Sequence, residues 1–297
     1  IENKFRFEND TRLESGVKIN FGVSLEQATY QNATFQKFGN TQGQQIIDFD
    51  SKFSMFKYAF FGQASKSFLN DDLKLSIGLR IDANNYNNEM ENPFNQFSPR
   101  IAASYSLSKN WFLNASLGKY YQLPAYTVLG FRDNNNVLIN KNSTKYIAAT
   151  HTVAGLEFRP ENKSKITLEG FYKGYSNYPF SVKDQISLAN LGNDFGVVGN
   201  EAVISNNDGR TYGFELLAQK KSNDGIYGIL SYTFVRSEFK GINNNYIPST
   251  WDNKHLLTFT GGKKLGKNWE IGAKFRLVGG RPYTPYNYEQ SAIIENY

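Results

Sequence analysis

Side chains that could carry out chemistry are few in this sequence. Histidine occurs only at His151 and His255, and the sequence has no cysteine. A histidine beside a serine or an acid could act as a general base, but spacing marks no such partner for either one. Both histidines lie near the start of a strand-like segment, so we interpret them as polar strand-end residues.

Metal and phosphate sites find no better support. The polar run 133–136 offers oxygen ligands of the kind calcium prefers, but it lacks the glycine and the carboxylate spacing of a calcium loop. Without cysteine there are no thiolate ligands and no disulfides. The pairs Gly261-Gly262 and Gly279-Gly280 sit at strand ends and do not open a helix as phosphate loops do. We therefore predict no metal, no cofactor and no enzyme activity.

Composition favours strands. Aromatic residues make up 15% of the 297 residues, with 24 Phe and 19 Tyr, and mean hydropathy is −0.52. No apolar run approaches the roughly 18 residues of a membrane-spanning helix. The net charge of +6 is spread along the chain, which argues against a nucleic-acid partner.

Strict alternation of apolar and polar residues is the clearest pattern. Apolar side chains occupy every second position from 17 to 25, from 73 to 81 and from 269 to 277, with Lys, Arg, Asn, Ser, Glu or Gly between them. This period of two predicts strands with one apolar face. About twelve such segments occur, near 4–13, 17–30, 50–66, 72–85, 97–107, 111–121, 147–159, 164–175, 210–221, 225–239, 254–264 and 268–280.

The connections alternate in length. Short turns are expected at 14–16, 69–72, 107–110, 160–163, 222–225 and 265–268, and long polar loops near 31–49, 86–96, 122–146, 176–209 and 240–253. Segments of about 10 to 17 residues suit a tilted strand that crosses a bilayer. Short turns on one side and long loops on the other are typical of outer-membrane barrels. We therefore predict an all-β protein, a transmembrane antiparallel up-and-down β-barrel.

Tryptophan occupies equivalent positions after two of the short turns. Lys109-Asn110-Trp111 and Lys267-Asn268-Trp269 repeat the same three residues. At a strand end, an indole ring suits the headgroup interface of a membrane. We predict that Trp111 and Trp269 belong to a membrane-interface girdle; the alternative is that both are ordinary aromatics beside turns.

Both ends of the chain are expected on the long-loop side, because the first segment runs toward a short turn and the last runs away from one. An unclosed sheet would leave two unpaired edges in hydrocarbon, and residues 291–297 do not resemble a closing strand. The chain is therefore expected to be an excerpt of a larger barrel, whose first and last strands do not pair with each other.

Several motifs resemble one known family. The sequence from 251 to 286 is similar to a late hairpin of TonB-dependent receptors, especially those of Bacteroidota. It begins with Trp251-Asp252-Asn253-Lys254-His255, continues through two strands joined by a short turn, and ends with Gly279-Gly280-Arg281-Pro282-Tyr283 and residues 284–286. Phe97-Ser98-Pro99-Arg100, together with residues 120–124, resembles the mid-barrel hairpin of the same family. Tyr212-Gly213-Phe214-Glu215 resembles one of its later strands. The resemblance covers residues 50–286.

The resemblance implies a 22-stranded barrel with an N-terminal plug that imports a scarce nutrient, such as a siderophore, glycan or peptide, using energy from TonB. The chain would supply about twelve of those strands, and the plug and the final strands are not in this sequence. Implied partners are outer-membrane lipid, TonB through the absent N-terminal region, and a small nutrient ligand. Whether a surface lipoprotein is also a partner is not decided by the resemblance. The implied location is the outer membrane of a Gram-negative cell. A passive pore or a structural surface barrel is the alternative, and a barrel enzyme ranks third.

Ligand binding is expected in the long loops, because aromatic faces with hydrogen-bonding tips suit sugars, peptides and siderophores. The competing interpretation is that these side chains pack the loops against one another or belong to the girdle. The residues selected are Tyr126, Phe131, Arg132, Arg281, Tyr283 and Tyr286.

Overall fold

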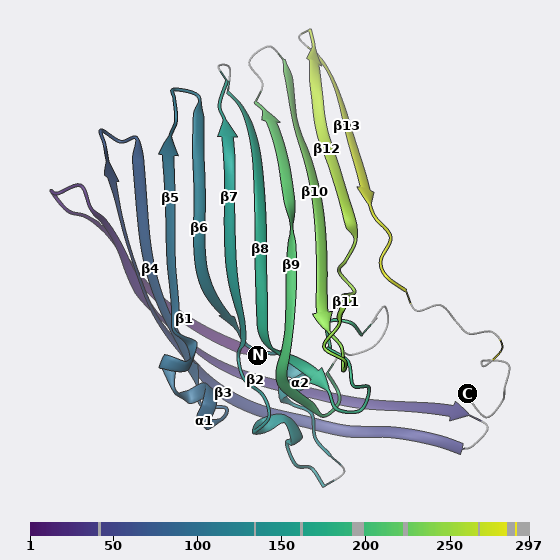
Figure 1. The fold of residues 1–297 in the computed structure, drawn as a ribbon. Helices are drawn as coiled ribbons and strands as arrows, with labels where there is room; N and C mark the ends of the chain where they lie inside the picture. Colours follow the sequence, from purple (N-terminus) through teal and green to yellow (C-terminus); the bar gives the residue numbers. More distant parts are fainter. Residues whose placement is uncertain are drawn as a thin grey trace.

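A computed structural model describes residues 1–40, 43–133, 135–160, 163–191, 199–221, 225–266, 268–283 and 289. In these residues twelve antiparallel strands follow one another in a single sheet, and a thirteenth, β11, pairs beside β10 (Figure 1). The strands are β1 (Glu2–Arg12), β2 (Lys18–Asn40), β3 (Gly43–Phe68), β4 (Leu73–Asn84), β5 (Ser98–Ser106), β6 (Trp111–Gln122), β7 (Ile147–Phe158), β8 (Ser164–Ser181), β9 (Val203–Lys220), β10 (Ile226–Lys240), β11 (Tyr246–Pro248), β12 (Lys254–Leu265) and β13 (Trp269–Val278).

The four short helical segments of the described residues lie in the long connections. They are α1 (Asn88–Glu91), α2 (Tyr126–Leu129) and the 3-10 turns η1 (Pro93–Gln96) and η2 (Ile139–Lys141). Across the described ranges, no helix has the length and apolar character needed to cross a membrane.

All twelve predicted strands are confirmed, but the predicted loop at 31–49 is wrong. β2 and β3 continue as one hairpin, with Gln31 opposite Lys52 and Asn40 opposite Gly43. This stretch has no apolar alternation, but main-chain groups of any sequence can hydrogen-bond across a hairpin, so the side-chain pattern did not reveal the pairing. The 176–209 loop is shorter than predicted, because β8 runs to Ser181 and β9 starts at Val203.

The short turns lie together at one end of the sheet and the long connections at the other (Figure 1). Gly16 closes the first turn with φ +81, a conformation that glycine adopts without steric cost. The turn after β3 instead uses Leu69, Asn70 and Asp71, all with positive φ.

The register divides each strand between two faces. Leu79 lies opposite Gly62, and Ile81 opposite Phe60, on the face that carries the exposed apolar side chains. Arg80 lies opposite Phe61 on the other face, and the two side chains make a cation–π contact. The predicted separation is confirmed in β13 as well, where Phe275 is 52% exposed beside Phe259.

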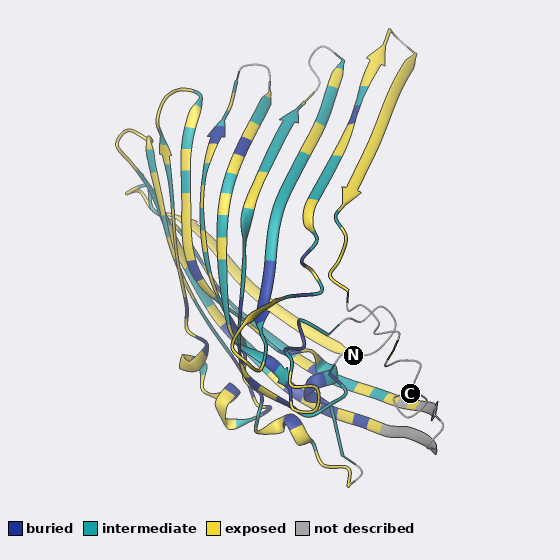
Figure 2. Ribbon diagram, turned by 45° about the vertical axis from the view of Figure 1, so that its right-hand side comes forward, coloured by how far each residue is buried: buried dark blue, intermediate teal, exposed yellow. Residues whose placement is uncertain are grey.

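The sheet curves into a trough with two free edges (Figure 1). Within the described strands, β1 pairs only with β2, and β13 only with β12. The prediction that the first and last strands do not pair with each other is therefore confirmed. Buried residues gather at the long-connection end (Figure 2).

Candidate functional site

Two long connections fold back onto the sheet and form a small hydrophobic core with it. Strands β2 and β3 contribute Ala28, Phe53 and Met55. The connection after β4 contributes Tyr86 and Met90, and the connection between β6 and β7 contributes Leu129 and Tyr146. Met90 and Leu129 are fully buried. These connections are therefore part of the packed structure and do not simply project from the sheet.

Helix α2 is held against β3 by hydrogen bonds from side chains to main-chain carbonyl oxygens. The Ser51 hydroxyl donates to the carbonyl oxygen of Gly130, directly after α2. A guanidinium nitrogen of Arg132 donates to the carbonyl of Lys52 at 2.9 Å. The approach is close: a Cβ on Gly130 would lie 2.7 Å from the Ser51 hydroxyl oxygen.

The same connection also contacts strand β9. Val128 packs against Leu188 and Val203. The Asn140 side-chain amide donates to the carbonyl oxygens of Val128 and Glu201, each at 2.8 Å. Because β3 and β9 are not neighbours in the sheet, a segment that touches both must lie on the concave side. The polar face is therefore the inner wall.

A charged network lies where α2 meets the inner wall. The Tyr126 hydroxyl accepts a hydrogen bond from Lys57 Nζ and donates to Glu2 Oε1, both at 2.7 Å. Lys57 also pairs closely with Glu26, and Lys4 Nζ lies 2.8 Å from a Glu2 oxygen. The network ties the first three strands to α2.

The tyrosines of these connections are held in their neutral form. Burial raises the pKa of Tyr146 to about 12, against the effect of its hydrogen bond from Asn84. Burial also raises the pKa of Tyr86 and of Tyr126 above the ordinary phenol value. At physiological pH all three are uncharged packing groups whose hydroxyls can still hydrogen-bond.

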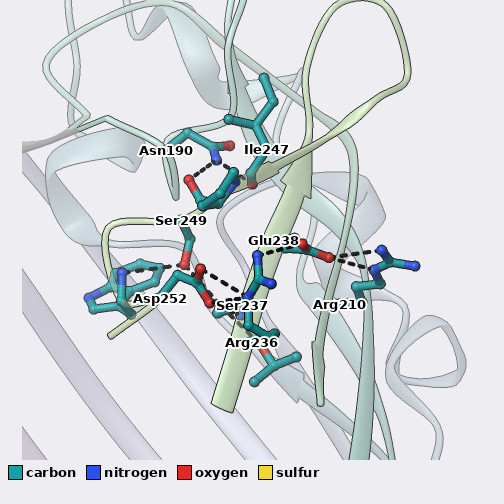
Figure 3. Close-up of polar contacts among 11 residues, drawn as sticks. Asn190, Arg210, Arg236, Ser237, Glu238, Ile247, Ser249 and Asp252 are labelled. Carbon is teal, nitrogen blue, oxygen red and sulfur yellow. Dashed lines mark hydrogen bonds and ion pairs between the residues drawn. The ribbon is translucent and has the colours of Figure 1, made fainter. Parts of the chain in front are cut away.

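A second polar cluster lies at the ends of β9 and β10 (Figure 3). The Asp252 carboxylate is fully buried, accepts the main-chain N–H of Ser237 at 2.8 Å, and lies 3.2 Å from Arg236 Nε. Glu238 pairs with Arg236 at 3.1 Å and with Arg210 at 2.8 Å. The pairing of β10 with β12 ends at Val235 and Lys254, the first residue of β12. Two residues further along β10, the Asp252 carboxylate accepts the Ser237 N–H in place of a main-chain carbonyl of a neighbouring strand.

The two histidines lie on opposite faces. His151 is on the inner wall, with its ring centroid 4.5 Å from that of Tyr120. His255 is on the convex face, where its Nδ1 lies 2.9 Å from the Tyr232 hydroxyl. Neither histidine has a carboxylate hydrogen-bond partner among the described residues. Among the residues that the structure describes, no three His, Asp or Glu side chains come close enough to hold a metal ion.

Those residues selected from sequence that the structure describes do not gather into one pocket. Tyr126 and Arg132 anchor α2, and Phe131 is half-buried beside them. Arg281 is exposed, as is Tyr283 at 85%. Tyr286 lies outside the described residues. A ligand role for the six remains a prediction.

Trp111 and Trp269 both lie on the convex face near the short turns. They are 44% and 76% exposed. Trp111 packs against Phe158, with ring centroids 4.6 Å apart. This position suits an interfacial girdle, which also remains a prediction.

Sequence reasoning missed the buried polar residues that hold the connections. Asn140 and Asn84 are fully buried, but in the sequence they are ordinary loop or strand-end asparagines. Asp252 did carry a signal, because it belongs to the Trp251-Asp252-Asn253 motif quoted above.

The fold and the folded-back connections together define the wall of a transmembrane β-barrel. A family model described as "TonB dependent receptor-like, beta-barrel" matches residues 2–296, and the chain belongs to this family. The resemblance to TonB-dependent receptors is thereby confirmed, and the Bacteroidota type remains a prediction. No curated protein matches the chain.

Solved structures of similar fold are receptors and a transporter. P. aeruginosa FpvA bound to a heterologous pyoverdine is 14% identical with a TM-score of 0.67, covering 97% of this chain and 39% of that one. The ferric-catecholate import receptor Fiu from E. coli K12 is 13% identical with a TM-score of 0.65, covering 94% and 44%. The copper transporter OprC is 19% identical with a TM-score of 0.64, covering 93% and 42%. The chain thus spans less than half the length of each.

Proposed function

We propose that this chain forms part of the barrel wall of an outer-membrane receptor that imports a scarce small nutrient with energy from TonB. The observation that carries the proposal is the match of residues 2–296 to the receptor barrel family. Two of the similar solved structures are named for import or transport, of ferric catecholates and of copper. The family implies a location in the outer membrane of a Gram-negative cell.

We further infer that additional strands close the barrel between β13 and β1. Unpaired main-chain groups on both edges would each cost several kcal/mol in hydrocarbon, so a stable membrane form needs partners for them. A plug and a TonB-contacting segment would belong to the same full-length protein. A surface lipoprotein could dock on the long-connection side.

The convex face supports a membrane location. On β10, every second residue from Ile226 to Phe234 lies on the convex face and is apolar, aromatic or glycine. The next residue on this face is Arg236. At about 3.3 Å per residue and a tilt of about 40°, this band is about 20 Å high. That is close to the roughly 25 Å apolar band of such barrels.

Nutrient uptake by the full-length receptor tests the function. Cells expressing it would be offered ferric siderophores, glycans and peptides as the limiting nutrient, with TonB active or inactivated. We expect uptake of one class that is lost when TonB is inactivated. Uptake that persists without TonB would contradict the proposal and indicate a passive pore.

The exposed loop residues give a finer test. Tyr283→Ala should weaken binding of that nutrient and leave barrel insertion unchanged, because the side chain is 85% exposed. Tyr172→Ala, on the convex face and 49% exposed, is the control and should leave nutrient binding unchanged. Unchanged binding in both variants would remove Tyr283 from the site.

A further inference from the structure

Four neighbouring strands place basic residues in one row across the inner wall. Arg100 on β5 lies opposite Gly118 on β6, Gly118 lies opposite His151 on β7, and His151 lies opposite Lys173 on β8. Adjacent strands are about 4.8 Å apart, so the row is about 14 Å wide. These residues are far apart in the sequence, and only the register brings them together.

Tyr120 forms the centre of this row. Its ring lies 4.3 Å from the Arg100 guanidinium carbon, and its centroid is 4.5 Å from that of His151. Gly118 leaves the space for this arrangement, because a Cβ there would lie 2.9 Å from the Tyr120 ring and 3.1 Å from Arg100 Cγ. The row is therefore a packed platform with a cation at each end.

The two end cations lack acidic partners. Among the described residues neither Arg100 nor Lys173 forms an ion pair, whereas Lys57, Arg6 and Arg80 on the same wall each pair with a carboxylate. The nearest acid along β8 on this face is Glu169, four residues from Lys173, or about 13 Å away. Both cations act electrostatically on His151.

The row is open to the concave side. Arg100 is exposed, and Tyr120, His151 and Lys173 are partly exposed. It lies beside the folded-back connections, because β7 begins at Ile147, directly after the buried Tyr146. A solute that passes these connections would meet the row next.

We propose that the Arg100–Tyr120–His151–Lys173 row binds a small oxyanion with more than one negative charge, a polycarboxylate or a phosphate ester. Two separated cations suit two anionic groups, and the Tyr120–His151 platform offers a flat surface between them. This inference rests on the proposed import function, since it supplies a chemical class for the imported solute.

Histidine NMR of the purified full-length receptor tests the row, with tricarballylate, a small tricarboxylate, as the probe. The His151 signal is assigned by its loss in His151→Gln. We expect tricarballylate to shift this signal saturably and to leave the signal of His255, on the convex face, in place. The uncharged trimethyl ester of the probe should shift neither.

Charge-removing variants provide the matched comparison. Arg100→Gln combined with Lys173→Gln should weaken tricarballylate binding by about tenfold or more, because two charge-assisted contacts are lost. Lys119→Gln is the control, because Lys119 is adjacent to Gly118 but lies on the convex face over Tyr121. It should leave the affinity unchanged.

Two results would overturn the proposal. One is a native receptor whose His151 signal does not respond to tricarballylate, and the other is a response with the same affinity in the double variant. If the His151 signal does not respond and the melting temperature falls in the double variant but not in Lys119→Gln, a carboxylate of the protein itself occupies the row. TonB-dependent nutrient uptake could persist in either case, so failure here is distinguishable from failure of the proposed function.

Discussion

The side-chain oxygen of Asn140 accepts a hydrogen bond from the main-chain N–H of Val203 at 2.9 Å, across 63 residues of sequence. Its amide nitrogen donates to two further carbonyl oxygens, so one buried side chain makes three bonds. Through them the connection that carries α2 is joined to the first residues of β9. Asn140 thus holds the β9 side of the inward-folded segment, as Ser51, Arg132 and Tyr126 hold its β3 side.

Asn140→Ala should loosen this junction without unfolding the barrel wall. Three hydrogen bonds at about 1 kcal/mol each are lost, and the buried groups left unpaired add to the cost. We expect faster amide hydrogen exchange at 126–130 and 201–205, with exchange in the centres of β6 and β7 unchanged.

Asn135→Ala is the matched control, because Asn135 is an exposed residue of the same connection. In this variant, amide hydrogen exchange at 126–130 and 201–205 should match that of the native protein. Equal protection of 201–205 in the native protein and in Asn140→Ala would contradict the role assigned to Asn140.

Strong alkali should destabilise the inward-folded core before it affects the strands. The pKa of Tyr146 is raised to about 12 in the folded protein, against about 10 in an unfolded chain. The folded state therefore holds a proton that the unfolded state loses between these values. The stabilisation is complete below pH 10 and declines as pH rises from 10 to 12, by on the order of 2 kcal/mol for this group.

Phenolate absorbance measured during an alkaline titration checks this expectation. Tyr146→Phe should remove one late-titrating group and leave the early ones in place. A native protein in which every tyrosine titrates near pH 10 would show that the core does not form in solution.

The strands could be predicted from sequence because a half-buried strand repeats every two residues. Leu73 to Ile81 and Trp269 to Leu277 follow this rule throughout. The extension of β2 and β3 could not be predicted, because Gln31 and Lys52 pair through main-chain groups that any sequence can supply.

The row of basic residues on the inner wall was harder to predict, because local sequence does not specify which strand residues lie opposite one another. Arg100, His151 and Lys173 are brought together by register, which no local pattern reveals. Tyr126 does lie in a long connection as the sequence suggested, but only the coordinates show its hydroxyl between Lys57 and Glu2, and its ligand role remains a prediction.

Gly130→Ala should displace α2 from β3. The added Cβ would meet the Ser51 hydroxyl oxygen at 2.7 Å and the carbonyl oxygen of Tyr126 at 3.0 Å. The carbonyl belongs to the main chain of α2, so the helix must shift, at a cost of about 1 to 3 kcal/mol. We expect faster proteolysis within 123–146.

Gly280→Ala is the control for this substitution, because nothing lies within 4 Å of a Cβ built there. Its proteolysis pattern should match that of the native protein. Identical cleavage in Gly130→Ala and the native protein would show that the connection tolerates the extra methyl group.

Asp252→Ala should be the most destabilising of these changes. The carboxylate is fully buried, and its loss leaves the Ser237 N–H without its acceptor and Arg236 without one of its two acidic partners. Removing one partner of a buried ion pair costs about 3 to 5 kcal/mol, and the partial exposure of Arg236 favours the lower end.

Asp252→Asn keeps an oxygen acceptor for Ser237 and should lose less stability. Asp208→Ala removes an exposed partner of Lys240 in the same region and should cost at most about 1 kcal/mol. Urea unfolding of the full-length receptor in lipid vesicles measures all three. If Asp252→Ala unfolds at the same urea concentration as Asp208→Ala, the buried carboxylate does not stabilise the end of β10.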